Sequence, residues 1–311
     1  MTDLVIRPLA KSETSDPFHS LAPALPDADL VGRPLLRPPH NVFELVSAGG
    51  QFRPEWTWLA LRDDVVVARA AFWGGPSDER PVALDYFDFL DHADGVALLR
   101  AVPFDAEFEL ILPPGWRADP AVRRAAERRM AAAEEAGYRR LTERFRYTWT
   151  PACGLPERPG RLTFRPEPDD AALLDVLTRV HSETRDHHAL RAIERSGGPG
   201  AAAREELEFI HWCPSPREWV RLAYTSQGEL VGIQVPAHNP AVPCVGFIGV
   251  VPEQRGHSYG YDLLVECTRT LAAEGAEVIA AATDVGNVGM AASFRRAGYP
   301  ITQRRYCLVR D

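Results

Sequence analysis

Hydrophobic and polar positions alternate along the second half of the chain with the periods of both strands and helices. Residues 243–251 are apolar at nearly every position, which predicts a strand buried on both faces. Residues 169–181 and 258–274 predict amphipathic helices. The other predicted elements of this half are strands at 162–165, 219–224, 230–235, 277–282 and 304–309, helices at 201–211 and 288–297, and a polar region between 181 and 201. This order predicts an α/β fold of the α+β type, with a mixed sheet covered by helices.

Three short segments of the first half recur in the same order about 160 residues later. VIRP at 5–8 corresponds to TFRP at 163–166, WTWLA at 56–60 to WVRLA at 219–223, and AGY at 136–138 to AGY at 297–299. Prolines and glycines between 150 and 160 are typical of a linker. The chain is therefore expected to hold two tandem domains of one plan, residues 1–150 and 161–311, joined by a linker at 151–160.

Composition narrows the function classes. The net charge is −8, which argues against a large surface for nucleic acid or anionic membranes. No run of apolar residues is long enough to span a membrane, and no signal-peptide pattern opens the chain. The five cysteines form no CxxC pair and are expected to be reduced thiols. We expect a cytoplasmic protein from a high-GC bacterium, monomeric or homodimeric, without a metal.

The segment after the apolar strand has the chemistry of an anion site. Residues 255–260 read Arg-Gly-His-Ser-Tyr-Gly and lead directly into a predicted helix, whose first backbone N–H groups and dipole attract phosphate. Arg255 adds a forked cationic donor, and the small residues Gly256, Ser258 and Gly260 allow close approach to the backbone. A simple strand–turn–helix connection is the alternative interpretation.

This segment resembles motif A of the GNAT superfamily, Arg/Gln-x-x-Gly-x-Gly/Ala after a strand that ends in Val-x-Pro. Ser258 stands where the central glycine of the motif is usual. A left-handed conformation there would cost serine roughly 1–2 kcal/mol. The resemblance implies a fold of two tandem GNAT-like domains and an acyl-CoA site formed by Ile248, Val250, Val251, Arg255, Gly256, His257, Ser258, Tyr259, Gly260, Tyr261 and Asn287.

A second segment, residues 283–299, resembles the Asn-x-x-Ala-x-x-x-Tyr-x-x-x-Gly-Phe block of the same superfamily. Asn287, Ala291 and Gly298 are in register, and Asn287 is also a candidate helix N-cap. The tyrosine that often serves as general acid in the superfamily is replaced by Phe294. We therefore expect no tyrosine acid from this helix.

The first half lacks the basic glycine loop. Its corresponding strand, 83–90, leads into residues 91–100, which carry acidic side chains where a phosphate would lie. Its last helix, 120–136, does not begin with asparagine. We expect a degenerate copy with a structural or substrate-shaping role.

The resemblance implies transfer of an acyl group, acetyl in the leading hypothesis, from acyl-CoA to a primary amine of a small molecule or peptide. Backbone N–H groups near Val250 would polarise the thioester carbonyl. No acid lies on 243–251 to deprotonate the amine. The candidates for this role are His181, Asp186 and His238, with His187 and His188 nearby.

Two alternatives remain open from the sequence. The replacements at Ser258 and Phe294 are compatible with an acyl-CoA-binding sensor or partner protein without catalysis. A transferase that takes its acyl group from aminoacyl-tRNA is a further alternative, against which the acidic chain counts.

Overall fold

The computed structural model describes residues 3–239 and 241–310, which form two compact units. The first unit combines the chain up to Glu143 with the segment from Gln303 onwards, and the second spans Arg144–Thr302. Each unit thus takes a terminal strand from the other half of the chain. The compact units therefore depart from the division expected at 151–160, because residues 144–149 belong to the second unit and 303–310 to the first.

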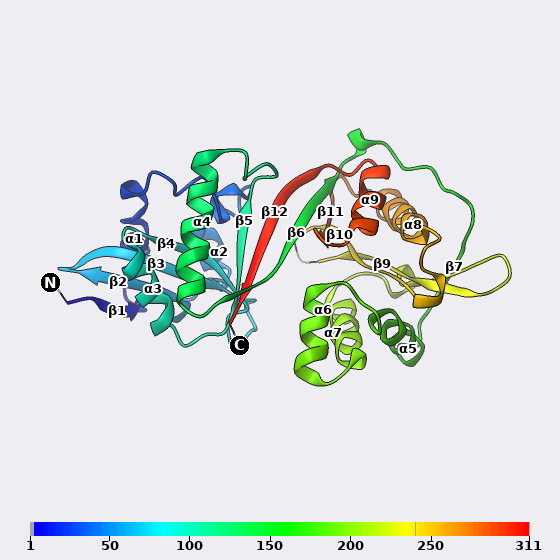
Figure 1. Cartoon of the computed structure of the whole chain (residues 1–311), viewed down its shortest axis with the longest axis horizontal. Helices are drawn as coiled ribbons and strands as arrows, with labels where there is room; N and C mark the ends of the chain where they lie inside the picture. Colours follow the sequence, from blue (N-terminus) through cyan, green and yellow to red (C-terminus); the bar gives the residue numbers. More distant parts are fainter. Residues whose placement is uncertain (1–2, 240, 311) are drawn as a thin grey trace. The chain divides into compact units, whose positions relative to one another are not determined.

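The first unit is a mixed sheet with its strands in the order β1-β2-β3-β4-β5-β12 (Figure 1). Neighbouring strands are antiparallel except β4 and β5, which are parallel and pair only at Ala83↔Glu107 and Leu84↔Phe108. Its strands are β1 (Val5–Pro8), β2 (Thr57–Arg62), β3 (Val65–Trp73), β4 (Ala83–Phe89), β5 (Glu107–Leu112) and the end of β12 (Ile301–Val309). Its helices are α1 (Asp16–His19), α2 (Phe43–Ala48), α3 (His92–Ala101) and α4 (Pro120–Glu135).

The second unit repeats this plan, with strand order β6-β11-β10-β9-β8-β7. The parallel pair is here β10 and β11, and the other pairs are antiparallel. Its strands are the end of β6 (Arg139–Trp149), β7 (Thr163–Pro166), β8 (Arg221–Tyr224), β9 (Leu230–His238), β10 (Pro243–Val250) and β11 (Ile279–Asp284). Its helices are α5 (Asp170–His181), α6 (His187–Ser196), α7 (Pro199–Trp212), α8 (Tyr259–Ala273) and α9 (Val288–Arg296).

Helices cover the two faces of the second sheet, α8 and α9 on one and α5, α6 and α7 on the other (Figure 1). Alternate residues of β11 show this division. Ile279 and Ala281 pack with Leu264 of α8, whereas Ala280 packs with Cys213 at the end of α7. Side chains of β11 with even numbers therefore face α5–α7.

The repeated segments occupy equivalent places in the two units. VIRP and TFRP form β1 and β7, and each AGY segment follows the last helix of its unit. Gly137 and Gly298 both have positive φ, 101° and 78°, as expected for a helix that ends in a left-handed residue. The predicted α/β fold of two tandem domains is confirmed.

Helix α6 is the main difference from the predicted elements, since residues 187–196 were expected to be irregular. Asp186 caps the helix by accepting from the N–H groups of His188 and Ala189, and Gly197 ends it in the left-handed conformation. Its apolar residues Ala189, Ala192 and Ile193 recur at helical spacing, so the helix could have been predicted from the sequence. Among the described residues, no helix has the length and apolar character required to cross a bilayer.

Candidate functional site

Strand β10 has one edge that is largely unpaired. It pairs with β9 along its length but with β11 only at Cys244↔Ala280. A bulge between Val245 and Phe247 shifts its register against β9. Beyond Cys244, backbone groups of β10 are therefore available on the β11 side.

The separation of β10 from β11 also changes the burial of its side chains. Residues 245–248 and Val250 are half-buried, so the prediction that 243–251 is buried on both faces is wrong. The physical reason is that apolar side chains here lack the neighbours that a fully paired strand provides. Ile248 and Val250 are thus accessible, whereas Val251 is fully buried and its N–H donates to Val231.

The loop from Gly256 to Gly260 presents backbone N–H groups at the start of α8. Among the described residues, none of the N–H groups of 256–260 has a hydrogen-bond acceptor. The N-cap, Ser258, has left-handed backbone angles (φ 61°, ψ 24°), and its side chain does not cap the helix. A Cβ added to Gly256 would meet nothing within 4 Å. The helix start is therefore open to an anion.

The Arg255 side chain is bonded to backbone carbonyl groups on either side of the loop. Its guanidinium donates to the carbonyl oxygens of Val250 (3.2 Å), Glu183 (2.8 Å) and Val180 (2.9 Å). These bonds join the end of α5 to the end of β10. The side chain thus anchors the loop.

Arg161 supports the same loop and was missed in the sequence because it lies at the first position of the expected second domain, far from the loop along the chain. Its guanidinium forms an ion pair with Asp262, donates to the carbonyl oxygen of His257 (3.0 Å), and lies 4.9 Å from the ring centroid of Tyr259. The His257 and Tyr259 rings stack on each other, and Tyr261 is buried under Arg296.

Asn287 is the N-cap of α9, as expected, and accepts from the N–H of Met290 at 3.2 Å. Phe294 is buried and stacks on Tyr147 with ring centroids 4.2 Å apart. The Tyr299 hydroxyl is hydrogen-bonded to Thr268 at 2.7 Å, and burial raises the pKa of this phenol. Neither aromatic side chain is arranged to deliver a proton.

The α5–α7 face brings together two of the three candidate catalytic residues. His181, at the end of α5, is 3% exposed, and its ring centroid lies 5.4 Å from that of Phe247 on β10. Neither ring nitrogen has a hydrogen-bond partner among the described residues. Burial lowers the pKa of His181, although the charge of Asp186 opposes the shift, so the imidazole is neutral near pH 7.

Asp186 itself has the properties of a structural cap. Burial would raise its pKa, but the charge of Arg144 and the N–H groups of Ala189 and His188 outweigh burial and lower it. A carboxylate stabilised in this way is a weak base. The third candidate, His238, lies at the end of β9 opposite Pro243, with its ring 5.9 Å from that of Trp219.

Glu206 of α7 is an ionisable residue that the sequence analysis missed. Burial and the negative charge of Asp186 raise its pKa to about 8, while Arg144 opposes the shift. Its position was readable, since it falls on the same helix stripe as the buried Ala203 and Ile210. A glutamate in a helix is usually taken to be exposed to solvent. Here its alignment with the buried residues of α7 predicts correctly that it is half-buried.

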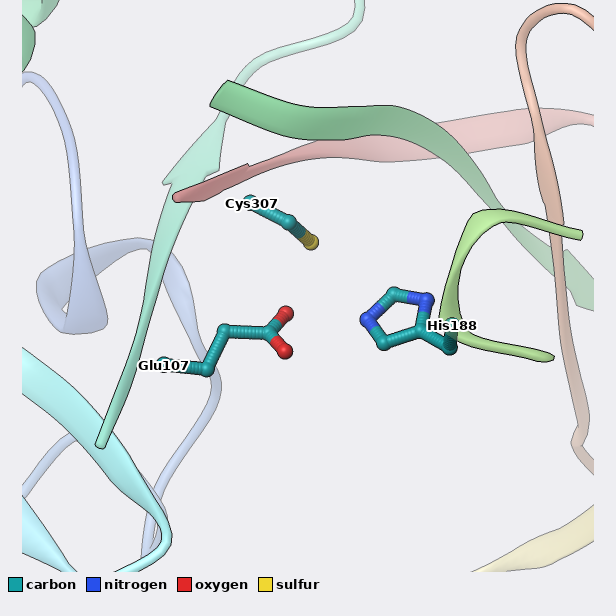
Figure 2. A group of neighbouring side chains, drawn as sticks. All are labelled: Glu107, His188 and Cys307. Atoms are coloured by element: carbon teal, nitrogen blue, oxygen red, sulfur yellow. The ribbon is translucent and has the colours of Figure 1, made fainter. Parts of the chain in front are cut away.

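Two groups of side chains in the described part of the chain contain potential metal ligands. Asp186, His188 and Asp284 lie within 4.8 Å of one another in the second unit, but Arg144 already supplies positive charge to both carboxylates, at 3.6 Å and 3.3 Å. Glu107 and Cys307 extend from β5 and β12 of the first unit (Figure 2). His188, also labelled there, belongs to the second unit. We infer no metal site from either cluster.

The profile of the acetyltransferase (GNAT) family matches residues 187–299. The search of curated proteins found no match to the chain. Among solved structures, a GCN5-related N-acetyltransferase from Sphaerobacter thermophilus has a TM-score of 0.53 at 16% identity, with 98% of this chain and 94% of that chain covered.

Two further structures are similar over nearly the whole chain. A glucosamine N-acetyltransferase region of a fungal multi-domain β-N-acetylglucosaminidase has a TM-score of 0.51 at 12% identity, with 99% of this chain and 38% of that chain covered. A tandem GNAT protein from the clavulanic acid biosynthesis pathway has a TM-score of 0.49 at 18% identity, with 98% of each chain covered.

Proposed function

We propose that this chain, whose residues 187–299 match the profile of the GNAT family, transfers an acyl group, acetyl in the simplest case, from acyl-CoA to a primary amine. The observation that carries this proposal is the open start of α8 at the end of a half-exposed, bulged strand. Backbone N–H groups and an apolar strand edge suit the two chemically different parts of acyl-CoA, its pyrophosphate and its pantetheine arm.

The pyrophosphate would be bound by the N–H groups of residues 256–260 and by the positive end of the α8 dipole. Arg161 and Arg255 would contribute by holding the loop in shape. The pantetheine amides would pair with the free edge of β10, and its apolar carbons would cover Ile248 and Val250.

The thioester would then lie near the bulge between Val245 and Phe247. A bulge turns backbone N–H groups out of the ladder, so they can donate to the oxyanion that forms when an amine attacks. This proposed thioester position lies closer to the start of β10 than the position near Val250 that we expected from the sequence.

The acceptor would approach from the α5–α7 face. The carboxylate of Asp186 on this face favours a positively charged amine over a carboxylate or phosphate group. An alkylammonium with a pKa near 10 must lose a proton before it attacks.

Purified protein should be incubated with acetyl-CoA and a panel of polyamines, amino acids, aminoglycosides and small peptides, with free CoA thiol as the readout. Amine-dependent thiol release supports transfer. Calorimetry with acetyl-CoA should show one site per chain, and two equal sites would contradict the assignment to α8 alone.

A specific observation favours one alternative, an acyl-CoA sensor. Phe294 has no hydroxyl and the Tyr299 hydroxyl is bound to Thr268, so neither residue supplies a free phenol to protonate the departing thiolate. A CoA thiolate, with a pKa near 8.5, can leave without an acid when the oxyanion is well stabilised, so transfer remains our first proposal. Tight acetyl-CoA binding without thiol release for any amine would favour the sensor, and binding of charged tRNA instead would favour an aminoacyl transferase.

A further inference from the structure

Asp284 ends β11 and holds His187 by two bonds. One carboxylate oxygen, Oδ2, accepts from the backbone N–H of His187 at 2.9 Å and lies 2.7 Å from its ring Nδ1. The Asp284 side chain is only 1% exposed, whereas that of His187 is 45% exposed. A buried carboxylate thus fixes both the start of α6 and the orientation of an accessible imidazole.

This arrangement selects one tautomer of the neutral ring. Because Nδ1 faces a carboxylate, it carries the proton, and Nε2 carries the lone pair. Among the described residues, Nε2 has no hydrogen-bond partner. His187 therefore presents a basic nitrogen with its orientation already set.

The register of the sheet places this pair near the bulge of β10, where we propose that the thioester lies. Cys244 of β10 lies opposite Ala280 of the parallel strand β11, so with the extra residue of the bulge Asp284 comes level with Gly249, past the bulge. Asp284 has the same parity as Ala280, which packs toward α7. It therefore faces the side of the sheet from which we expect the acceptor.

The other ionisable groups of this face are less suited to the role. His181 has no residue that orients its ring, Asp186 is a helix cap, and Glu206 has no hydrogen-bond partner among the described residues. We propose that His187 is the general base of the transfer reaction and Asp284 its positioning residue, an inference that rests on the proposed function.

In this step, Nε2 of His187 takes one proton from the acceptor ammonium, and Asp284 stabilises the imidazolium formed. The freed lone pair of the amine forms the C–N bond to the thioester carbonyl, and the C–S bond breaks when the tetrahedral adduct collapses. CoA leaves as a thiolate and takes up the second amine proton, and the imidazolium releases its proton to water.

The charges around the pair are compatible with this role. Nε of Arg144 lies 3.3 Å from Oδ1 of Asp284, so this carboxylate faces a guanidinium on one oxygen and the imidazole on the other. Arg144 also lies 3.6 Å from Asp186, and His188 lies 4.0 Å from the same carboxylate. The charge of Asp186 raises the pKa of Glu206, and the charge of Arg144 lowers it. Arg144, Asp186, His188 and Glu206 should therefore be left unchanged in the variants that test His187 and Asp284.

The test uses the full chain and the best amine of the panel. His187→Asn keeps a donor at the Nδ1 position but removes the base, so kcat should fall by about 10²–10⁴ while acetyl-CoA affinity and melting temperature are retained. Asp284→Asn should favour the wrong tautomer, lower kcat at least tenfold and move the acid limb of the pH–rate profile to lower pH. Free imidazole should partly restore the rate of His187→Ala.

His211→Asn is the matched control. His211 also pairs with an aspartate, Asp170, at 3.0 Å, but both side chains are half-exposed on the surface. Its kcat should stay within about twofold of the wild type.

The outcomes separate the two proposals. An active wild type together with an active His187→Asn variant overturns the dyad and leaves the acyltransferase assignment intact. A loss of activity in His187→Asn that is accompanied by loss of acetyl-CoA binding, or an absence of imidazole rescue, assigns His187 a structural role and also overturns the dyad. A wild type that releases no thiol with any amine overturns both.

Discussion

Helices α3 and α8 are counterparts in the two units, yet their first turns differ in charge and in hydrogen bonding. In α3, the N-cap Asp91 accepts from the N–H of Ala93 at 2.8 Å, and the buried Asp94 pairs with Arg62 at 2.6 Å. In α8, the N-cap Ser258 leaves the N–H groups unused. Equivalent helices of the two units thus differ in whether their first N–H groups face a carboxylate or remain without an acceptor.

The strands before these helices differ in the same way. Six of the seven residues of β4 are buried, whereas most of β10 is half-exposed. In the first unit Phe18, Phe43 and Phe52 pack around Tyr86 of β4, and Asp88 is held between Arg69 and Arg129. In the first unit, paired charges and aromatic rings therefore bury β4 and its side chains. In the second unit, β10 stays half-exposed and the N–H groups at the start of α8 stay accessible.

The largest expected effect is on the stability of the first unit. Asp88→Ala leaves two buried guanidiniums without their shared carboxylate and should lower the free energy of unfolding by about 3–5 kcal/mol. Denaturant unfolding measures the change. Glu127→Ala, which removes an exposed partner of Arg123, is the control and should change stability by less than ~1 kcal/mol. Equal effects would mean that the buried network is no more important than a surface pair.

Transfer of the α3 cap to α8 should remove the anion site. Ser258→Asp introduces the carboxylate that Asp91 supplies in α3, and repulsion of the pyrophosphate should weaken acetyl-CoA binding by about 100-fold or more. Calorimetry gives the affinity, with the isosteric but neutral Ser258→Asn as control. Unchanged affinity in the Asp variant would place the pyrophosphate elsewhere.

A smaller effect is expected from Glu206 on the α5–α7 face. Because the pKa of Glu206 is raised from 4.5 to about 8, the folded state binds this proton more tightly than the unfolded state does. The resulting stability is present below about pH 4.5 and is lost as the pH rises to about 8. Glu206→Gln should remove roughly 2 kcal/mol of this pH dependence, discounted for partial solvent contact. Urea unfolding at pH 5 and pH 8 tests it, and parallel slopes in both proteins would contradict the shift.

The smallest effect concerns the strained cap. Ser258→Gly relieves a left-handed serine that costs roughly 1–2 kcal/mol, but glycine loses about 0.5–1 kcal/mol in entropy, so the net gain should be below ~1 kcal/mol. Thermal unfolding measures it. Ser182→Gly, at a right-handed helix end, should instead lower the melting temperature. A loss at Ser258 as well would show that the serine hydroxyl is needed there.

Local features of the site could be predicted from sequence because they depend on neighbours in the chain. The open start of α8, the N-cap at Asn287 and the left-handed Gly298 follow from residues within one turn. The same holds for the order of strands and helices, since each element carries its own period, and for the duplicated plan, which the three repeated segments mark.

Tertiary structure alone decided the pairing of distant segments. Strand 303–309 lies in the first unit and strand 144–149 in the second, because hydrogen-bonding partners are chosen by the whole sheet and a strand's own pattern does not specify them. The half-exposure of β10 has the same origin, since its apolar sequence does not reveal that β11 separates from it.

The roles of individual side chains divide along the same line. The basic loop residue Arg255 was correctly located, but its guanidinium reaches carbonyl oxygens of α5 that are distant in sequence. Asp284 becomes a partner of His187 only when β11 meets the start of α6. Sequence by itself determined most of the elements, the repeat and the open start of α8, whose causes are local. The folded sheet decided which charges meet, because the short distances that set their energies join residues far apart in the chain.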